Sequence, residues 1–442
     1  MPSRMGNRKH QVVATVAEPG TGAEAVHTGP VPNGRKRLVP PIMPARSAVP
    51  VSERAVAEDF LELDAQLSEE ERAGRELVRA FCARRLRPEL PAWFEQGLRR
   101  ETARELMREF GGLGLLGMHL QGYGCAGVGA VSYGLACTEL EATDSGFRSM
   151  VSVQGSLAMS TIHRFGSDEQ KAAWLPAMAS GEKVGCFGLT EPDSGSDPGS
   201  MRTAARRDGG DWVLSGTKMW ITNGGIADVA VVWARTDDGI RGFLVPAGTP
   251  GFAANDIHQK LSLRASITSE LVLDGVRLPG SAMLAGAHGL GAPLASLNEA
   301  RFGIVFGALG AARDAFTCAL DYARSRVQFG RPIAGFQLTQ AKLVDMLLEL
   351  QKGALLALHL GRLKEAGRLR PEQLSLAKLN NVRVALEICR SARTVLGANG
   401  VTLEYPVLRH MSNLESVLTY EGTSEVHTLI VGQALTGQNA FR

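Results

Sequence analysis

Three differently patterned segments follow one another in this 442-residue chain, and their order constrains the fold more than any single motif does. From Glu58 to about Gly185 helical signals dominate, beginning at Leu67-Ser68-Glu69-Glu70-Glu71, which is typical of a capped helix start. Between about Cys186 and Leu290, short runs rich in β-branched and aromatic residues are separated by Gly, Asn and Asp. Long helical patterns return after Leu290. The order predicts an α+β fold in which an N-terminal helical domain and a C-terminal helical bundle flank a small β domain.

The changes of pattern place the domain boundaries. We expect an extension over residues 1–52, followed by helical, β and helical domains over 53–185, 186–290 and 291–442. The extension holds only Glu18 and Glu24 as acids and is rich in Pro, Gly, Ala and Arg, so we expect it to be disordered. Its composition also suits a transit peptide, although prolines interrupt it and it has no amphipathic stripe. The expected location is cytoplasmic, or the mitochondrial matrix if the extension is a transit peptide.

Charge and composition exclude several function classes. The 48 basic and 45 acidic residues leave a formal charge of +3, and no basic block is interleaved with aromatics, so we expect no nucleic-acid partner. Apolar runs such as Ala354–Leu358 end well before the ~20 residues that a membrane span needs. The six cysteines and nine histidines lack metal-ligand spacing, which predicts free thiols and no metal site. Any redox chemistry would therefore need an organic cofactor.

A glycine pattern in the first helical segment imitates a dinucleotide-binding motif. Residues Gly112-Leu113-Gly114-Leu115-Leu116-Gly117 match G-x-G-x-x-G, but that fingerprint requires a preceding buried strand and a following helix. The residues from Glu101 to Phe110 instead form a charged helical pattern that ends in glycines. We interpret the motif as a helix C-cap with a loop.

Two neighbouring segments of the β domain favour a site for a heteroaromatic ring. The loop from Cys186 to Asp197 gathers hydroxyls, glycines and backbone N–H groups where the helical pattern gives way to strands. The segment Trp220-Ile221-Thr222-Asn223-Gly224 would place an aromatic wall and a hydroxyl near that loop. By composition alone, the loop also suits a Ser/Gly turn, and Trp220 suits an aromatic at a sheet edge before a turn.

The segment Tyr420-Glu421-Gly422-Thr423, close to the C-terminus, supplies the candidate for a catalytic base. A lone carboxylate beside two small residues and an aromatic is an arrangement in which a buried base can reach a substrate carbon. Taken alone, these four residues favour a surface turn instead. Their context in the rest of the chain has to decide between the two interpretations.

That context is a set of motifs spread over most of the chain. They are Gly122-Tyr123-Gly124-Cys125-Ala126-Gly127, Asp144-Ser145-Gly146-Phe147-Arg148-Ser149, the loop from Thr190 to Asp197, Trp220-Ile221-Thr222, Arg326-Val327-Gln328-Phe329-Gly330, Leu396-Gly397-Ala398-Asn399-Gly400 and Tyr420-Glu421-Gly422-Thr423. In these motifs and their order the chain resembles the acyl-CoA dehydrogenase family, most closely its glutaryl-CoA dehydrogenase branch, from about Leu63 to Phe441. The resemblance implies two helical domains around a small β-barrel-like domain. It also implies bound FAD, a homotetramer, an acyl-CoA substrate and an electron-transfer flavoprotein as acceptor.

The resemblance also implies roles for individual residues. The flavin ring would be held by Phe187, Leu189, Thr190, Gly195, Ser196, Trp220, Ile221, Thr222, Thr423 and Phe441. A neighbouring subunit would reach the pyrophosphate and adenine of FAD through Arg326, Gln337 and the stretch from Thr394 to Ala398, which includes Leu396 and Gly397. The substrate and its CoA portion would be contacted by Ser196, Arg301, Tyr420 and Gly422.

Glu421 would be the base that removes the α-proton, while its own backbone N–H and a ribityl hydroxyl of the flavin polarise the thioester carbonyl. Burial against flavin and acyl chain should raise the pKa of Glu421 toward neutrality. In some branches of the family the base comes from the helix that here reads Asn298-Glu299-Ala300-Arg301. That position is Ala300, which cannot take a proton, and we expect its neighbour Glu299 to be an exposed helix residue.

Substrate choice depends on Arg148. Beside Ser149, its guanidinium would offer a fork of donors to a second, distal carboxylate, as the glutaryl branch requires; the alternative is an ordinary salt bridge with Asp144 or Glu141. Glu141 and Tyr420 also match positions of the branch that decarboxylates its product to crotonyl-CoA and CO2, with protonated Glu421 acting as the acid. Phe147, Met150 and Ala398 depart from the branch's pattern. The alternatives are another short-chain acyl-CoA dehydrogenase, an acyl-CoA oxidase, or a non-catalytic acyl-CoA-binding scaffold.

Overall fold

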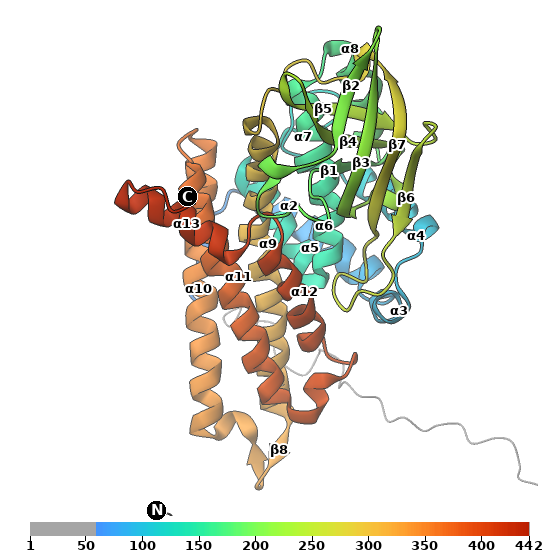
Figure 1. Cartoon of the computed structure of the whole chain (residues 1–442). Coiled ribbons are helices and arrows are strands. Elements are labelled where there is room, and N and C mark those ends of the chain that lie inside the picture. Colours follow the sequence, from blue (N-terminus) through green and yellow to red (C-terminus); the bar gives the residue numbers. More distant parts are fainter. Residues whose placement is uncertain (1–58, 442) are drawn as a thin grey trace, which may run out of the picture. The chain divides into compact units, whose positions relative to one another are not determined.

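The computed structural model describes residues 59–441, so the predicted extension over residues 1–52 lies outside the described residues. The first part of the described chain is helical, as the sequence predicts (Figure 1). Its elements are η2 (Leu63–Gln66), α2 (Glu69–Phe81), the π-helical segment η3 (Cys82–Leu86), α3 (Leu90–Gln96), α4 (Arg100–Gly112), α5 (Ala130–Thr143), α6 (Ser145–Ser152), the π-helical segment η4 (Val153–Met159), α7 (Ser160–Phe165) and α8 (Asp168–Ala179).

Local sequence explains where several of these helices begin and end. Ser68 caps α2 by accepting from the Glu71 N–H at 3.2 Å, and the Glu71 carboxylate accepts in turn from the Ser68 N–H at 2.8 Å. This capping box confirms the predicted helix start and stabilises it by about 1 kcal/mol. The glycine pattern Gly112–Gly117 lies at the end of another helix: α4 runs to Gly112, and the chain then turns through Gly114 at φ +71°. A helix precedes these glycines, so the helix C-cap interpretation is confirmed.

The middle part forms a curled seven-stranded sheet. Its strands are β1 (Gly185–Gly188), β2 (Ala204–Asp208), β3 (Asp211–Thr222), β4 (Val229–Thr236), β5 (Gly239–Pro246), β6 (Phe252–Asp256) and β7 (Thr268–Pro279), with the short helices η5 (Pro198–Ser200), η6 (Gly224–Ile226) and η7 (Gly280–Ala282) between or after them. The order is β1-β4-β2-β3-β7-β6, with β5 paired to β4. Strands β1 and β2 run parallel to β4, and the other pairs are antiparallel.

Strand β4 shows how this sheet joins two cores. Val229, Val231 and Trp233 belong to the large cluster that includes the helices, whereas Ala230 and Val232 pack inside the sheet's own core. A strand buried on both faces has to be apolar throughout, which is why this run shows no alternation of polar and apolar residues. Strand β4, which pairs with β1, therefore packs the sheet against the helices.

The last part returns to helices: α9 (Gly291–Ser325), α10 (Gln337–Glu365), α11 (Pro371–Leu396), α12 (Val407–Thr419) and α13 (Ser424–Thr436), with a hairpin of β8 (Val327–Gln328) and β9 (Arg331–Pro332) and the short helices η8 (Ile333–Gly335) and η9 (Gly397–Val401). Figure 1 shows α9, α10, α11 and α12 side by side, the hairpin at one end of this bundle, and α13 at the other. Leu343, Leu350 and Leu358 form a buried stripe on α10, with the helical spacing expected of the long patterns after Leu290.

Helix α9 is the core of the helical bundle. By length and composition it is the one helix among residues 59–441 that is long and apolar enough to cross a membrane, and the prediction of no such segment overlooked it. In the structure 89% of its most apolar 18-residue window is buried inside the protein. The central helix of a globular core has the same composition because neighbouring helices cover it on all sides.

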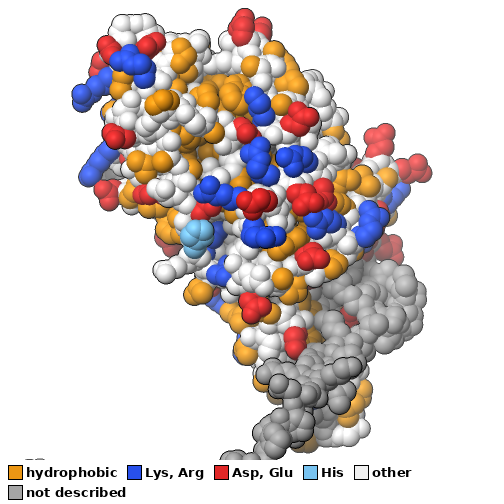
Figure 2. Space-filling model, turned by 90° about the vertical axis from the view of Figure 1, so that its right-hand side faces the viewer, with side chains coloured by type: hydrophobic (Ala, Val, Ile, Leu, Met, Phe, Trp, Pro, Cys, Tyr) orange, Lys and Arg blue, Asp and Glu red, His pale blue; other side chains and the backbone are white. Residues whose placement is uncertain are grey.

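On the face shown in Figure 2, Lys and Arg side chains lie among Asp and Glu side chains and do not gather into a patch of one sign. This mixture agrees with the balanced charge of the sequence. It offers no continuous basic track of the kind that nucleic-acid phosphates bind.

Candidate active site

Glu421 lies in the short turn between α12 and α13. Tyr420 is the C-cap of α12 and Thr423 is the N-cap of α13, where its hydroxyl accepts from the Val426 N–H at 3.3 Å. Glu421 has φ +53° and Gly422 has φ +98°, so both residues occupy the left-handed region. Left-handed backbone at a residue with a side chain is uncommon and persists where surrounding contacts enforce it.

The Glu421 carboxylate is buried on one side. Its Oε2 atom is shielded from solvent without a hydrogen-bond partner among residues 59–441, although the residue as a whole keeps partial exposure. Burial raises the pKa of this carboxyl above its usual value of 4.5, and it does so against the opposing charges of Arg148, Lys378 and Arg301. The predicted direction of the pKa shift is confirmed. An unpaired carboxylate with a raised pKa has the properties of a proton-accepting base.

Two buried basic side chains bind the backbone around Glu421. The Arg301 Nε of α9 donates to the Glu421 carbonyl oxygen at 2.7 Å, and its Nη1 donates to Asn298 at 2.6 Å. Lys378 of α11 donates to the carbonyl oxygens of Tyr420 and Gly422, the latter at 2.6 Å. Sequence reasoning expected Arg301 to contact CoA and missed Lys378 altogether. A signal was present, because Lys378 interrupts the buried face of its helix between Leu374 and Ala385.

Arg148 lies beside this turn and is engaged by two groups. Its Nε donates to Glu141 Oε2 at 2.7 Å, and its Nη2 donates to the Tyr420 hydroxyl. Arg148 and Glu141 are 1% and 0% exposed as side chains, and Ser145 donates to the other Glu141 oxygen at 2.9 Å. The salt bridge with Glu141 that the sequence left open is therefore present. Nη1 of Arg148 has no hydrogen-bond partner within residues 59–441.

The neighbours of Arg148 complete this picture. Ser149, the next residue on α6, is 5% exposed. Asp144, the other partner that the sequence offered to Arg148, instead caps α6 and binds Arg409 at 2.7 Å. Phe147 is fully buried and packs edge-on against Trp93 at a centroid distance of 5.9 Å.

The rival base position carries no carboxylate. Ala300 is fully buried on α9. Its neighbour Glu299 is half-buried and binds Lys364 at 2.7 Å, so the expectation of an exposed helix residue was wrong. The Lys364 charge lowers the pKa of Glu299 against the opposing effect of burial, which leaves this carboxylate ionised and committed to its partner.

The predicted ring-binding loop and the Trp220 segment lie together. The Met219 N–H donates to the Thr190 carbonyl at 2.8 Å, and the buried Lys218 donates to the Leu189 carbonyl at 3.1 Å and to Glu191 at 2.8 Å. Phe187 and Leu189 are buried beneath this loop, Thr190 is half-buried, and Gly195 and Ser196 are exposed. Sequence reasoning missed the Lys218–Glu191 pair that anchors the loop.

Trp220 projects from the sheet because the pairing of β3 with β7 shifts there. Lys218 pairs with Leu271 and Ile221 pairs with Ser269, so two residues of β3 oppose one residue of β7. Trp220 sits in this bulge at φ +65° and is 61% exposed, whereas Ile221 is buried. A bulge beside a site is a common way to aim a side chain outward.

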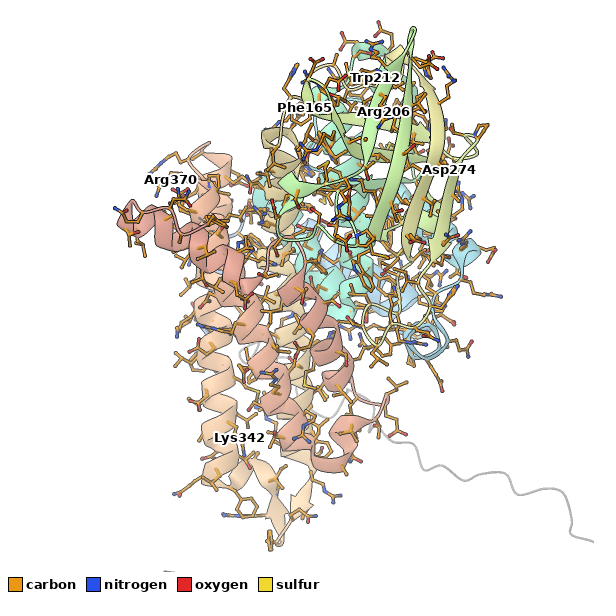
Figure 3. The ribbon with its side chains drawn as sticks, in the orientation of Figure 1. Phe165, Arg206, Trp212, Asp274, Lys342 and Arg370 are labelled. Carbon is orange, nitrogen blue, oxygen red and sulfur yellow. The ribbon has the colours of Figure 1, made fainter. Side chains whose placement is uncertain are left out.

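Several other predicted cofactor residues lie at the other end of the bundle. Arg326 follows α9, and its N–H donates to the Tyr322 carbonyl at 2.8 Å, while Asn399, after Gly397, donates to the Tyr322 hydroxyl at 3.0 Å. Along α9, 25 residues separate Arg301 from Arg326, which corresponds to about 38 Å. Lys342, near the start of α10, marks this end in Figure 3, and Arg370 marks the opposite end, where α13 lies. Gln337, the first residue of α10, and Leu396, the last of α11, belong to the distant group; Thr423 and Phe441 belong to the C-terminal segment around α13.

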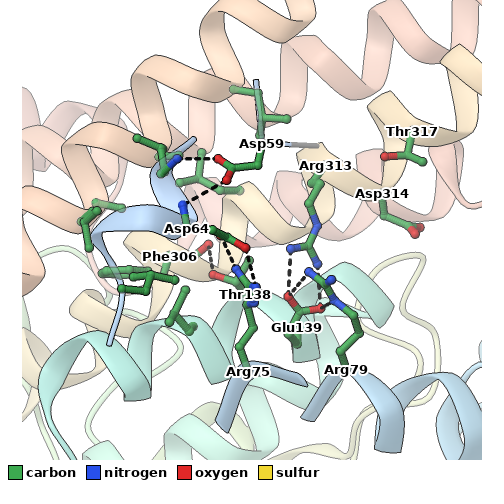
Figure 4. A pocket seen from close by; sticks show the side chains of 18 of the residues that line it. Asp59, Asp64, Arg75, Arg79, Thr138, Glu139, Phe306, Arg313, Asp314 and Thr317 are labelled. Atoms are coloured by element: carbon green, nitrogen blue, oxygen red, sulfur yellow. Dashed lines mark hydrogen bonds and ion pairs between the residues drawn. The ribbon is translucent and has the colours of Figure 1, made fainter. Parts of the chain in front are cut away.

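A separate cavity of about 710 Å³ lies between α2, α5, α9 and α10 (Figure 4). Its charged residues form ion pairs: Arg75 binds Asp64 at 2.6 Å, and Glu139 binds Arg79 at 3.0 Å and Arg313 at 2.7 Å. These two cations lower the pKa of Glu139 to about 2 although burial opposes the change. Glu421 does not line this cavity, and its paired charges have a structural role.

Comparison with known proteins gives a consistent family match. Sequence models of the acyl-CoA dehydrogenase N-terminal, middle and C-terminal domains match residues 68–182, 186–276 and 287–436 in turn. Among curated proteins, the mitochondrial short-chain specific acyl-CoA dehydrogenase of Homo sapiens is 39% identical over 333 residues, which are 74% of this chain and 81% of that protein.

Two solved structures are more similar still. The crystal structure of glutaryl-CoA dehydrogenase from Mycobacterium smegmatis is 71% identical with a TM-score of 0.86, covering 87% of this chain and 99% of that one. A second structure of a glutaryl-CoA dehydrogenase from the same organism, in complex with FADH2, is 64% identical with a TM-score of 0.85, covering 88% of this chain and 100% of that one.

Proposed function

The chain belongs to the acyl-CoA dehydrogenase family, and from this premise we propose that it oxidises glutaryl-CoA and decarboxylates it to crotonyl-CoA and CO2. The observation that carries the choice of substrate is the buried Arg148 beside Glu421, with Nη1 left without a partner among residues 59–441. A purely apolar acyl chain would give this guanidinium nothing to bind.

FAD is the cofactor of this enzyme, and the residues present fit it. The joined loop and bulge offer the Trp220 ring together with backbone groups near Thr190, which suits a large heteroaromatic ring. We propose that the residues named above for the flavin ring hold it there. When bound, FAD accepts the β-hydrogen of the substrate as a hydride.

Glu421 supplies the proton chemistry. Its carboxylate takes the α-proton of the thioester, and the Glu421 N–H donates to the thioester oxygen on which negative charge develops. Oε2 is shielded from solvent and has no hydrogen-bond partner among residues 59–441, which makes ionised Glu421 a stronger base than a carboxylate in water, because accepting the proton removes a poorly solvated charge.

Arg148 would bind the distal carboxylate of the substrate. Around Glu421, the basic side chains of Arg148, Arg301 and Lys378 lie near two carboxyl groups among the described residues, those of Glu141 and Glu421. A substrate carboxylate would add an anionic partner for Arg148 in a site where unpaired charge is costly. Glu141 orients the guanidinium through Nε and Tyr420 through Nη2, so that Nη1 is left for the ligand.

The same arrangement suits decarboxylation. After oxidation the γ-carboxylate leaves as CO2, and the electron pair of the broken C–C bond delocalises into the thioester as a dienolate. Glu421 then carries the proton it removed earlier and returns it to the γ-carbon, which yields crotonyl-CoA. Both proton transfers use one carboxyl group, so they require no further titratable residue.

A neighbouring subunit would complete the cofactor site. Arg326 and Gln337 lie too far from Arg301 on the same chain to share one FAD with Glu421, since about 38 Å of α9 separates the two arginines. The outward face of α10 carries the exposed residues Val344, Leu348 and Leu355 opposite its buried stripe. An apolar face of this kind fits subunit contact, and we propose a homotetramer that passes electrons to an electron-transfer flavoprotein.

Parallel assays on glutaryl-CoA and butyryl-CoA test the substrate. We expect Arg148→Ala to raise the KM for glutaryl-CoA about tenfold to a hundredfold, with a much smaller effect on butyryl-CoA, because a charge-assisted hydrogen bond is lost. Arg409→Ala is the matched control, since it removes another buried arginine, which binds Asp144 at the start of the helix that carries Arg148. It should affect both substrates equally. A wild-type preference for butyryl-CoA, or the absence of CO2 from glutaryl-CoA, would instead assign the chain to the short-chain branch that its curated relatives represent.

A further inference from the structure

Three successive carbonyl oxygens of the Glu421 turn are each bound by a buried basic side chain. Lys378 Nζ donates to the Tyr420 oxygen and, at 2.6 Å, to the Gly422 oxygen, while Arg301 Nε donates to the Glu421 oxygen at 2.7 Å. Lys378 is 1% exposed and comes from α11, and Arg301 is 7% exposed and comes from α9. Two different helices therefore fix the one turn that carries the base.

The contact with Tyr420 has a direct geometric consequence for Glu421. The Tyr420 carbonyl and the Glu421 N–H belong to one peptide group, and in a planar trans peptide they point in opposite directions. With its oxygen held by Lys378, this peptide turns the Glu421 N–H away from α11. That N–H has no acceptor among residues 59–441. It is the donor that the proposed function aims at the thioester oxygen.

Charge strengthens the effect of position. Burial lowers the pKa of Lys378 to about 7, so its ammonium form predominates below that pH. A cation on the oxygen of an amide draws electron density from its nitrogen, so the N–H becomes a stronger donor. Lys378 thus acts on the thioester through the peptide bond without touching the substrate. A neutral side chain of the same size would keep the packing of α11 and lose both the hold on the carbonyls and this polarisation.

We propose that Lys378 is a positioning residue, which orients and polarises the peptide bond before Glu421 so that its N–H stabilises the enolate oxygen of the substrate. The inference rests on the proposed function in one respect, namely that a thioester binds with its carbonyl at Glu421. It does not depend on which acyl-CoA is the substrate.

Several other charged or titratable groups surround Glu421, and a test has to separate Lys378 from them. They are Cys137 and Glu141 on α5, Arg148 on α6, Arg301 on α9, Tyr420 in the turn itself and His427 on α13. Removing Lys378 also removes a charge that lowers the pKa of Glu421, so the pH profile of turnover alone would mix two effects. Ionisation of a bound ligand to its enolate measures more directly how strongly the Glu421 N–H stabilises the enolate oxygen.

Acetoacetyl-CoA is a suitable probe, because its α-carbon lies between two carbonyls and its enolate can be measured by ultraviolet absorbance. In the FAD-loaded enzyme we expect Lys378→Met to raise the apparent pKa of the bound α-proton, so that enolate formation at a given pH falls about tenfold. The kcat for the acyl-CoA substrate should fall about tenfold to a hundredfold, with a change in KM of less than about threefold.

Lys260→Met is the matched control. Lys260 likewise binds two backbone carbonyls, those of Leu263 at 3.0 Å and Ser266 at 2.9 Å, but these belong to the middle domain. This variant should leave the enolisation of the probe unchanged even if the protein becomes less stable. Lys378→Arg, which keeps a cationic donor, should recover part of the lost enolisation.

Unchanged enolisation and kcat in Lys378→Met would overturn the inference. If that variant does not fold, Lys378→Gln takes its place, because it keeps a hydrogen-bond donor and removes the charge. Wild-type enolisation in Lys378→Gln would also overturn the inference. Failure of the wild-type enzyme to oxidise any acyl-CoA would instead count against the proposed function, so the two failures are distinguishable.

Discussion

Gly307 of α9 and Glu141 of α5 approach each other so closely that a Cβ atom on Gly307 would lie 2.2 Å from Glu141 Oε2. This oxygen is also the one that accepts from Arg148 Nε at 2.7 Å. The absence of a side chain at Gly307 therefore allows the carboxylate to reach the guanidinium that we assign to the substrate. The pair is nearly sealed from water, so a displaced Glu141 has no alternative partner in solvent.

We expect Gly307→Ala to displace Glu141 and to misorient Arg148. The KM for glutaryl-CoA should rise more than the KM for butyryl-CoA, and the free energy of unfolding should fall by about 1–3 kcal/mol because the helix contact is overpacked. Steady-state kinetics on both substrates and thermal denaturation measure the two effects. Gly74→Ala on α2 is the control, since a Cβ at that position meets nothing within 4 Å. An unchanged KM ratio in Gly307→Ala would contradict the role given to the Glu141–Arg148 pair.

Residues such as Ser68 and Val229 show what the sequence could predict. Capping boxes, strand runs and helical periods are local patterns, and the elements they predict are present at Ser68, at Val229–Trp233 and along α10. The candidate base could also be proposed from the sequence, because the motif around Glu421 is contiguous. Helical period alone does not show which face of a helix is buried, since Leu77 of α2 is 52% exposed and its neighbour Val78 is 2% exposed.

Contacts between residues far apart in the chain could not be predicted from the sequence. Lys378 lies 42 and 44 positions from the carbonyls it binds, and no local pattern shows which backbone a buried lysine will reach. Glu299 was misjudged for the same reason, since its partner Lys364 is 65 positions away. Pairing of this kind depends on how helices pack. A polar residue on an otherwise buried helix face predicts that a partner exists, but does not identify it.

A second prediction concerns the stability of Glu421→Gln. Burial raises the folded-state pKa of Glu421 above 4.5, so its proton binds more tightly in the folded protein than in the unfolded chain. The resulting stabilisation is fully present below about pH 4.5 and is lost as the pH rises through the raised pKa. Gln cannot ionise, and we therefore expect Glu421→Gln to be more stable than the wild type at neutral pH, with a difference that shrinks as the pH falls toward 4.5.

The same variant should keep FAD and lose turnover by about 10²- to 10⁴-fold, because the amide cannot accept the α-proton. Chemical denaturation at several pH values, flavin absorbance and steady-state kinetics provide the measurements. A variant less stable than the wild type at neutral pH would show that ionised Glu421 is favourably paired in the folded protein. Near-normal turnover would remove Glu421 from the role of base.

The third prediction concerns the outward face of α10. Val344 and Leu348 are 61% and 54% exposed, and the proposed assembly covers them. We expect Val344→Glu combined with Leu348→Glu to dissociate the oligomer, since two carboxylates would be buried without partners. Most FAD should be lost with it, because Arg326 and Gln337 would no longer reach the neighbouring subunit's cofactor. Sedimentation and flavin absorbance measure both changes.

Leu77→Glu on α2 controls for the general effect of replacing an exposed leucine by a carboxylate. It should leave both the assembly and the flavin content unchanged. A dissociated α10 variant that keeps its full complement of FAD would refute the shared cofactor site, and an unchanged mass would place the subunit contact elsewhere.

The final prediction separates two reasons for Gly422. Its φ of +98° disfavours any side chain, and a Cβ there would also lie 2.7 Å from His427 Nε2. The imidazole has little room to move aside, because His427 is 1% exposed. Gly422→Ala should therefore shift the turn, weaken the contact between Lys378 and the Gly422 carbonyl, and misplace Glu421.

We expect Gly422→Ala to lower kcat about a hundredfold and to destabilise the protein by more than about 1 kcal/mol. Gly432→Ala on α13, where a Cβ meets nothing within 4 Å, should instead stabilise the protein by about 0.5–1 kcal/mol. The double variant Gly422→Ala with His427→Ala makes room for the new methyl group but leaves the backbone conformation unfavourable. Partial recovery of kcat there would assign part of the loss to the imidazole contact. Recovery to the wild-type value would mean that the left-handed backbone at Gly422 does not by itself require glycine, whereas no recovery would mean that the backbone conformation accounts for the whole loss.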